Sequence, residues 1–277
     1  MSLAPHDPRV HPHLPEGIAL ALSVGSYRGA AHVSVIRALE RAGIPVHLVV
    51  GTSTGALAGV LYSAGVPVDR LDAALRTLRL ENLFSASIGP DGFTDMAPAR
   101  AGIEALIGGQ RDIRSFPRRF ACIAADALTG EAVVLDAGDA SLAVQASMAV
   151  PGLVRPVRIG DRMLVDGAVV QPMPVSVARA LGARVVVAVD VNVPRFGGHP
   201  PRHPAESLNH CLDMAIQRLC ALELATADVV VRPDIAHIKQ DLAGVDSLLR
   251  AGEAAGEAAV AAIRQRLGQH PSQALAH

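Results

Sequence analysis

The chain has 277 residues, 50% of them hydrophobic, and this length supports one large domain with a substantial buried core. It carries 25 Lys and Arg against 26 Asp and Glu, and the formal net charge of −1 argues against nucleic-acid binding and charge-driven binding to anionic membranes. No apolar run approaches the roughly 18 residues that a transmembrane helix requires. We therefore expect a soluble, cytoplasmic protein. Peripheral contact with a membrane stays open as an alternative.

The two ends of the chain are predicted to be tails around a single domain. Residues 1–16 contain four Pro and three His without periodicity, which is typical of a flexible segment. The domain is predicted over 17–268 and is followed by a C-terminal tail over 269–277. The histidines lack Cys or acidic partners at ligand spacing, so they predict no metal site. We expect the three cysteines to be free, buried thiols: Cys122, Cys211 and Cys220.

Strand and helix signals alternate along the first part of the chain. Short apolar runs predict buried strands, and apolar residues at helical spacing predict the helices between them. A segment over 81–96 shows neither pattern and is predicted to be an irregular loop. The strands are expected at 17–24 and 46–50, and the helices at 30–44, 55–65, 68–78 and 97–107. This alternation indicates an α/β fold with a mostly parallel sheet and helices on both faces.

The rest of the chain continues the α/β pattern. Two strands are predicted around a Leu-Thr-Gly turn, then a helix that ends before Pro151, then a hairpin about Gly160 and Asp161. Two further buried strands flank a long helix, and an Ala-rich helix closes the domain. In chain order, these elements are expected at 118–128, 131–138, 139–150, 157–169, 184–191, 205–226, 227–234 and 246–267.

One Ser lies on a predicted turn between a strand and a helix. The sequence Gly51-Thr52-Ser53-Thr54-Gly55 follows the strand at 46–50 directly and opens the next helix. A nucleophile on such a turn requires small residues two positions before and after it, because the backbone brings those neighbours together. The turn would place the Ser53 hydroxyl over a helix N-terminus, whose dipole favours developing negative charge. The pattern predicts a nucleophile elbow.

The group that accepts the Ser53 proton must come from elsewhere in the chain. Asp166 ends a predicted apolar strand, and the following Gly167 leaves its carboxylate free to project from the strand end. An α/β-hydrolase triad would instead need a His in a loop after a late strand, and His237 comes nearest to that position. Asp166 is therefore the preferred base, and an esterase with a Ser-His-acid triad stays open as an alternative.

Together, these residues resemble the patatin-like acyl hydrolases, including small bacterial members, from about Gly17 to Val193. "GTSTGALAG" resembles the nucleophile elbow of the family, and "VDGA" resembles its Asp-Gly-Ala/Gly motif. "SYRGAAHVSVIRALERAGI" resembles the segment after the family's glycine loop, and "ADALTGEAVVLDAG" with "AVQASMAVPGLVRPVRI" resembles the sequence between nucleophile and acid. Motifs that match in the family's order over most of the chain are a specific signal.

The resemblance implies a patatin-like three-layer fold and a Ser-Asp dyad that works without His, metal or cofactor. Ser53 would attack an acyl carbonyl, and Asp166 would accept its proton and return it to the leaving alcohol. The substrates would be fatty-acyl esters of phospholipids, lysophospholipids or neutral lipids. Because a carboxylate has a reference pKa of about 3.9, the site must raise the basicity of Asp166 by partial desolvation or accept a slower reaction.

The glycine loop departs from the family pattern. Three consecutive glycines before x-Arg-Gly would form the oxyanion hole, whereas Val24, Gly25 and Ser26 occupy those positions here. Backbone amides need no particular side chain, so the predicted hole is the stretch Gly25, Ser26, Tyr27 and Arg28. A β-branched Val at positive φ would cost about 1–3 kcal/mol, and the loss of one donor would cost roughly 10²–10³ in rate. A catalytically weakened lipid-binding or regulatory protein is therefore the alternative to a slow enzyme.

Two further features near the predicted site have alternative interpretations. The loop over 81–96 is a candidate lid or acyl groove, although its large side chains could equally pin it to the core. Arg28 is expected to hold the glycine loop or to meet an anionic head group. The candidate groove residues are Phe84, Ile88, Phe93 and Met96.

Overall fold

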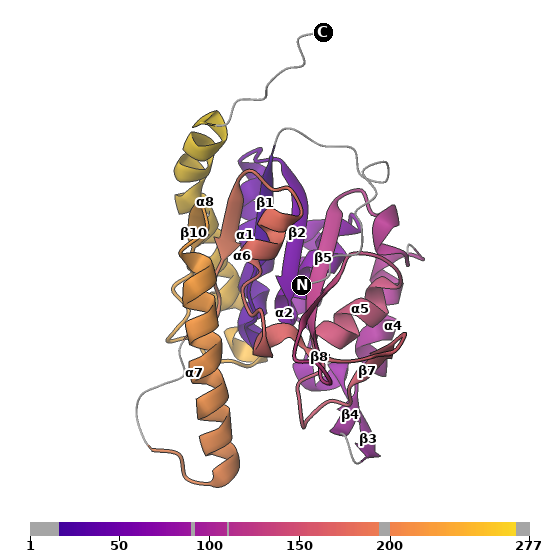
Figure 1. Ribbon diagram of the computed structural model, residues 1–277. Helices are drawn as coiled ribbons and strands as arrows, with labels where there is room; N and C mark the ends of the chain where they lie inside the picture. Colours follow the sequence, from indigo (N-terminus) through magenta and orange to yellow (C-terminus); the bar gives the residue numbers. More distant parts are fainter. Residues whose placement is uncertain (1–16, 90–91, 110, 194–199, 270–277) are drawn as a thin grey trace.

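The computed structural model describes residues 17–89, 92–109, 111–193 and 200–269 as a three-layer α/β structure (Figure 1). The predicted N-terminal tail lies outside the described residues, as does the predicted C-terminal tail after Gln269. A mostly parallel central sheet carries helices on both faces, which confirms the predicted fold class. Within the described ranges, no helix combines the length and the apolar character that crossing a membrane requires.

The central sheet is built from the apolar runs that predicted strands. Its strands are β1 (Ile18–Leu22), β2 (Val46–Thr52), β5 (Arg119–Asp126), β6 (Ala132–Leu135), β7 (Val157–Ile159), β8 (Arg162–Asp166), β9 (Val186–Val189) and β10 (Val229–Val231). Their order is β10-β9-β1-β2-β5-β8-β7, and β6 pairs with β5. The pairings from β10 to β5 are parallel, whereas β6, β7 and β8 pair antiparallel. The parallel strands end at a common sheet edge, where open α/β sheets bind their ligands.

Helices cover both faces because the residues of each strand alternate between two apolar cores. The helices are α1 (Ala30–Arg41), α2 (Thr54–Ser63), α3 (Val68–Leu75), α4 (Ala97–Ile107), α5 (Ala140–Ser147), α6 (Val175–Ala180), α7 (Pro204–Leu224) and α8 (Val245–Gln269). In β1, Ile18, Leu20 and Leu22 face the larger core with α1 to α5 and α8. Ala19 and Ala21 face the smaller core with α6 and α7. The two-residue period of a strand thus separates the layers.

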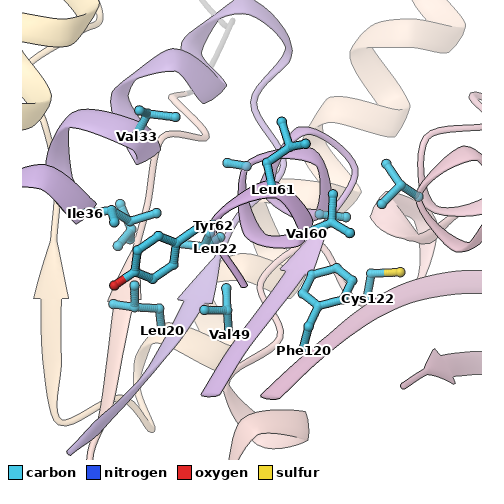
Figure 2. Close-up of a cluster of buried hydrophobic side chains, with 14 of the residues drawn as sticks. Leu20, Leu22, Val33, Ile36, Val49, Val60, Leu61, Tyr62, Phe120 and Cys122 are labelled. Carbon is cyan, nitrogen blue, oxygen red and sulfur yellow. The ribbon is translucent and has the colours of Figure 1, made fainter. Parts of the chain in front are cut away.

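The larger core packs α1 and α2 onto the sheet (Figure 2). Leu20 of β1, Val49 of β2 and Phe120 of β5 meet Ile36 of α1 and Val60 of α2, and these side chains are at most 3% exposed. Complete burial of one such side chain contributes about 1.5–3 kcal/mol relative to exposure. This packing holds the start of α2 at the sheet edge.

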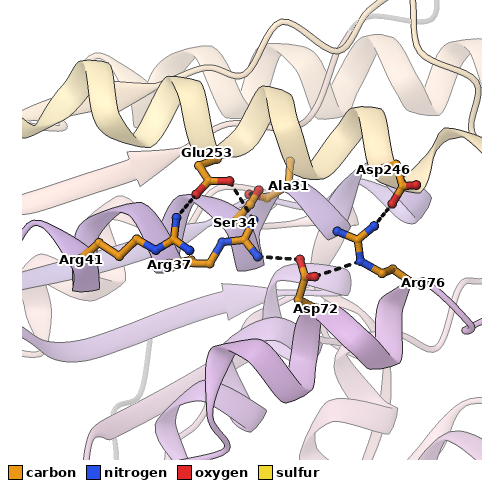
Figure 3. A network of polar contacts seen from close by, with 8 residues as sticks. All are labelled: Ala31, Ser34, Arg37, Arg41, Asp72, Arg76, Asp246 and Glu253. Atoms are coloured by element: carbon orange, nitrogen blue, oxygen red, sulfur yellow. Dashed lines mark hydrogen bonds and ion pairs between the residues drawn. The ribbon is translucent and has the colours of Figure 1, made fainter.

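A polar network joins α1, α3 and α8 (Figure 3). Arg37 of α1 donates to Asp72 of α3 at 2.8 Å and to Glu253 of α8 at 2.9 Å. Arg41 also pairs with Glu253, and Arg76 pairs with Asp72. Because one guanidinium with a side chain only 13% exposed bridges two helices, the network fixes α3 and α8 relative to α1. α3 also lines the cavity described below.

The segment over 81–96 is a hairpin, and the prediction of an irregular loop is wrong. A short 3₁₀ turn (Leu80–Leu83) leads into β3 (Ser85–Gly89), which pairs antiparallel with β4 (Gly92–Asp95). Residues of β3 do alternate, but Ala86 and Ile88 are exposed while Ser85, Ser87 and Gly89 are partly buried. This inverted pattern conceals the strand, because the usual signal assumes that the apolar face packs inward.

Two details of α6 and α7 also differ from the sequence-based prediction. α6 was not predicted, because six residues between a proline and Leu181 are too few to show helical periodicity. Cys211 on α7 is exposed, whereas Cys122 and Cys220 are buried as expected. All three are free thiols.

Candidate active site

The ends of β2 and β8 meet on one edge of β5. β2 pairs with β5 in parallel up to Thr52, opposite Ile123, and β8 arrives from the other direction until Asp166 lies opposite Ala124. β6 occupies the other edge of β5. Ser53, directly after Thr52, therefore lies at the end of β8, although 113 positions separate it from Asp166.

Ser53 and Asp166 are joined by a hydrogen bond. The Ser53 hydroxyl donates to Asp166 Oδ2 at 2.8 Å. The second carboxylate oxygen, Oδ1, accepts from the Ala168 amide at 2.8 Å, and the Asp166 amide donates to the Ala149 carbonyl at 2.8 Å. These contacts fix the carboxylate with one oxygen toward the hydroxyl. The distance lies within the range that direct proton transfer requires.

Ser53 lies on a strained turn between β2 and α2. Its φ of 56° and ψ of −120° are rare for a residue with a side chain and cost about 1–3 kcal/mol. A Cβ on Gly51 would lie 2.3 Å from the Gly55 carbonyl oxygen, and a Cβ on Gly55 would lie 2.3 Å from the Leu22 carbonyl oxygen. Close backbone approach therefore requires both glycines, in agreement with the spacing seen in the sequence. α2 begins directly after Ser53, so its positive dipole end lies at the hydroxyl.

Gly167 is required beside Asp166 because the chain passes close to β5. A Cβ at this position would lie 2.3 Å from the Ile123 carbonyl oxygen and 3.0 Å from Thr52 Cγ2. A larger residue would displace the strand end that carries Asp166. Thr52 donates its hydroxyl to the Gln171 carbonyl at 2.8 Å and so binds the elbow to the segment after Asp166.

The environment of Asp166 makes its carboxylate unusually basic. The residue is buried, with 3% of its surface exposed. Burial raises the pKa of Asp166 from 3.8 to about 6, while the hydrogen bonds from Ala168 and Ser53 oppose the shift. A carboxylate with this pKa is mostly ionised at neutral pH and accepts a proton more readily than an exposed one. Desolvation thus supplies the basicity that the sequence required of a Ser-Asp dyad.

The altered glycine loop accommodates Val24 without the strain considered above. The Val24 amide donates to the Pro172 carbonyl at 3.0 Å, and its side chain belongs to the smaller core. Positive φ falls instead on Ser26, at 54°, while Gly25 is extended. A Cβ on Gly25 would lie 2.5 Å from Val191 Cγ2, which explains why a glycine remains there. Among the residues that the structure describes, the amides of Gly25 and Ser26 have no hydrogen-bond acceptor.

Arg28 and Tyr27 support this loop from its two sides. Arg28 is 3% exposed, and it donates through Nε to the Gly25 carbonyl at 3.3 Å and through Nη1 to the Val193 carbonyl at 2.8 Å. The Tyr27 hydroxyl donates to Glu81 at 2.8 Å. Of the two roles expected for Arg28, these contacts correspond to holding the loop.

In the described part of the chain, no histidine hydrogen-bonds to Ser53. His32 is fully buried, with Nε2 2.9 Å from the Ser23 carbonyl oxygen, and burial lowers its pKa to about 4. His237 lies on the surface and pairs with Asp234 at 3.6 Å. The triad alternative therefore has no support among these residues, since the partner of the Ser53 hydroxyl is a carboxylate.

An apolar cavity of about 140 Å³ lies beside the elbow. Ser26, Tyr27 and Thr54, the residue after Ser53, line it, whereas Ser53 and Asp166 do not; helices α1 to α4 supply most of the remaining lining. Thr54 and Leu61 of α2 both line the cavity. Because they lie seven positions apart on the helix, the cavity extends along α2 for roughly 10 Å from the end that carries Ser53. The cavity has the apolar lining that is typical of a site for a hydrocarbon chain.

The sequence matches a known family over the region that carries the dyad and the loop. The model of the patatin-like phospholipase family matches residues 20–179, which is more than half of the chain. The chain belongs to the patatin-like phospholipase family. Membership in this family suggests a lipid hydrolase.

Relatives of this patatin-like protein carry names from the NTE family. An uncharacterised NTE family protein of Mycobacterium tuberculosis is 30% identical over 277 residues, which cover 88% of this chain and 46% of that protein. This chain thus spans about half the length of that relative. Lysophospholipase NTE1 of Scheffersomyces stipitis is 30% identical over 182 residues, which cover 64% of this chain and 12% of that protein.

A solved structure shares the patatin-like fold. VipD from Legionella pneumophila superposes with a TM-score of 0.56 at 14% sequence identity, over 92% of this chain and 67% of that chain. At this identity the likeness concerns the fold.

The four predicted groove residues do not line the cavity of this patatin-like domain. Met96 is fully buried in the core, and Phe84 packs against the core while partly exposed. Ile88 and Phe93 are 84% and 60% exposed on the hairpin. Leu83, another apolar residue of the candidate segment over 81–96, lies in the 3₁₀ turn before the hairpin and does line the cavity. The difference arises because the hairpin turns Ile88 and Phe93 outward, whereas Met96 and Phe84 pack into or against the core.

Ser147 contributes to the patatin-like site, although no pattern in the sequence marks it as a site residue. Its hydroxyl accepts from the Ser53 amide at 2.9 Å and donates to the Ile123 carbonyl at 2.6 Å. The side chain is fully buried at the end of α5. It therefore binds the strained elbow to β5. The segment "AVQASMAVPG", which resembles the family, contains this residue, but its spacing from other polar residues does not indicate a catalytic role.

The variant Ser147→Ala is expected to lose about 1–3 kcal/mol of unfolding free energy, because a buried amide and a buried carbonyl lose their partner. We also expect about a tenfold lower kcat for ester hydrolysis, since the elbow becomes free to shift. Urea unfolding and initial rates test both effects. Ser63→Ala is the matched control, because the buried Ser63 hydroxyl has no partner among the described residues. An unchanged kcat in Ser147→Ala would show that the elbow does not depend on this contact.

Proposed function

We propose that this protein is a serine acyl hydrolase that cleaves fatty-acyl esters of lysophospholipids, phospholipids or related lipids. The observation that carries the proposal is the 2.8 Å hydrogen bond from the Ser53 hydroxyl to the buried Asp166 carboxylate on a strained turn. The apolar cavity beside that turn and the family membership support a lipid substrate. The lysophospholipase name of the Scheffersomyces relative agrees with this class.

In the proposed reaction, the Asp166 carboxylate takes the hydroxyl proton while Ser53 Oγ forms a bond to the acyl carbonyl carbon. The carbonyl oxygen becomes an oxyanion, which the amides of Gly25 and Ser26 stabilise together with the N-terminus of α2. The bond between the acyl carbon and the alcohol oxygen then breaks, and Asp166 returns the proton to that oxygen. Water attacks the acyl-Ser53 ester by the same sequence, which releases the fatty acid and regenerates the hydroxyl.

The acyl chain of the substrate is proposed to lie in the cavity along α2. The carbonyl must reach Ser53, so the chain would enter past Thr54 and extend toward Leu61. Both residues line the cavity, together with Ala58 between them. The far end of the cavity would then limit the length of the chain that binds well.

Two substitutions on α2 are expected to change the preferred chain length in opposite directions. Ala58→Leu narrows the cavity and should lower kcat/KM for p-nitrophenyl decanoate about tenfold relative to p-nitrophenyl butyrate. Leu61→Ala lengthens the cavity and should shift the preference toward longer chains. A series of p-nitrophenyl esters measures both ratios. The same shift in both variants, or none in either, would place the acyl chain elsewhere.

Labelling with a fluorophosphonate tests the nucleophile directly. We expect the probe to label the wild-type chain at Ser53, identified by peptide mapping, because the hydroxyl is activated by Asp166. The alternative, a catalytically weakened lipid-binding protein, is motivated by the altered glycine loop. It predicts fatty-acid binding without labelling and without turnover of p-nitrophenyl esters, so one experiment distinguishes the two proposals.

A further inference from the structure

Four apolar side chains project into solvent from two neighbouring segments. Ile88 and Phe93 of the hairpin are 84% and 60% exposed, and Val150 and Leu153 of the loop after α5 are 36% and 48% exposed. We call these residues the apolar patch: Ile88, Phe93, Val150 and Leu153. Exposed groups of large apolar side chains are uncommon on soluble domains and mark surfaces that bind a partner.

Backbone contacts hold the two segments of the apolar patch together. The amides of Phe93 and Thr94 both donate to the Leu153 carbonyl at 3.1 Å, and the Arg155 amide donates to the Thr94 carbonyl at 2.9 Å. Gly92 packs so closely that a Cβ would lie 2.7 Å from the Arg155 amide nitrogen. The patch is therefore presented by a connected piece of structure, so its exposure is not the result of a single displaced side chain.

The apolar patch is continuous with the elements that form the site. The chain on either side of the hairpin lines the acyl cavity, through Leu83 before β3 and through Ala99 and Ile103 of α4 after β4. The loop that carries Val150 also contains Ala149, whose carbonyl accepts from the Asp166 amide at 2.8 Å. In Figure 1 the hairpin lies at the lower right, below α4, whereas α7 lies on the left of the view.

We infer that the apolar patch docks on the surface of a lipid bilayer or micelle and delivers substrate from it to the cavity. This inference rests on the proposed function, because a lipid substrate is held in such a surface and not in water. Apolar side chains beside an apolar acyl site match the chemistry of the acyl region of a bilayer. The chain has a formal net charge of −1, so attachment would come from burial of apolar side chains and not from charge.

Binding to phosphatidylcholine vesicles tests the docking. The 277-residue chain is expected to sediment with such vesicles, and a rise in salt concentration should leave the bound fraction unchanged. The double variant Ile88→Ser and Phe93→Ser should bind at least tenfold more weakly, because two exposed side chains lose the ability to enter the lipid. Leu222→Ser is the matched control, since Leu222 is 70% exposed on α7.

A single fluorophore can report insertion of the patch. The chain contains no Trp, so Phe93→Trp would introduce a unique indole in the patch. Its emission should shift to shorter wavelength with vesicles and should be quenched by brominated acyl chains, because the ring leaves water. Leu222→Trp should show neither change. Emission from Phe93→Trp that vesicles leave unaltered would overturn the inference, as would equal vesicle binding by the wild type and the double variant.

Activity on two substrates separates failure of docking from failure of the proposed function. We expect the double variant to lose at least tenfold in the ratio of vesicle lysophospholipid hydrolysis to p-nitrophenyl butyrate hydrolysis. An unchanged ratio would overturn the docking inference. Turnover of p-nitrophenyl butyrate by the same variant would still support the proposed function. If Ser53→Ala binds vesicles but the wild type hydrolyses neither substrate, the docking inference is supported and the proposed hydrolase activity is overturned. An absence of vesicle binding by the wild type would overturn the docking inference.

Discussion

Replacement of Ser53 by alanine is expected to lower kcat/KM for ester hydrolysis by at least about 10⁴-fold. The variant removes the hydroxyl oxygen that lies 2.8 Å from Asp166 Oδ2 and that would bond to an acyl carbon. The amides of the loop and the cavity remain, so they leave a small residual rate and an unchanged affinity for fatty acid. Hydrolysis of p-nitrophenyl butyrate and fluorophosphonate labelling measure the loss.

Two controls make the Ser53→Ala result specific. Ser63→Ala makes the same substitution at the other end of α2, where the buried hydroxyl has no partner among the described residues, and it should keep full activity. The unfolding free energy of Ser53→Ala should also stay within about 1–2 kcal/mol of the wild type. Turnover of Ser53→Ala at a tenth or more of the wild-type rate would exclude this hydroxyl as the nucleophile.

The second large effect is expected from Asp166→Asn, which should lower kcat by about 10²–10⁴-fold. The amide keeps the shape of the carboxylate but cannot take a proton from Ser53. In the wild type, kcat/KM should rise with pH through the pKa of Asp166, about 6, and then level off, because only the ionised carboxylate accepts the proton. The residual activity of Asp166→Asn should lack this rise. An identical pH profile in the variant would assign the titration to another group.

The same substitution is expected to stabilise the protein at neutral pH. Burial raises the pKa of Asp166 from 3.8 to about 6, so the folded protein binds the proton more tightly than the unfolded chain does. The stability that this protonation provides is complete below about pH 4 and is lost as the pH rises through about 6. A shift of this size corresponds to a loss on the order of 3 kcal/mol.

Unfolding at several pH values measures the free energy of unfolding that is lost when the buried Asp166 carboxyl group ionises. The neutral Asn at position 166 does not titrate, so the variant avoids the penalty for burying a charge. The unfolding free energy of Asp166→Asn relative to the wild type should therefore grow by about 2–3 kcal/mol between about pH 4 and pH 8. Thermal denaturation at both ends of this range checks the direction. A constant difference across the range would show that Asp166 titrates normally.

The sequence predicted the fold class because its signals are local. Short apolar runs identified the buried strands, apolar residues at helical spacing identified the helices, and the alternation of the two indicated parallel pairing. The elbow was visible for the same reason, since the close approach between Gly51 and Gly55 spans only four residues. No strand signal is visible in the sequence at β3, where the apolar side chains point outward, and the four residues predicted to form a groove do not line the cavity.

The sequence by itself determined which residue types were available at the site: a Ser between two glycines, an Asp before a glycine, and a loop with one glycine left. Only the tertiary structure decided how they act together. The end-to-end meeting of β2 and β8 on β5 brings Ser53 to Asp166, and burial of that carboxylate raises its pKa. Contacts between distant parts of the chain also bring the Ser147 hydroxyl to the Ser53 amide, and they bring α1 to α4 together around the cavity. Distance and desolvation depend on which surfaces pack together, and no spacing along a single chain encodes them.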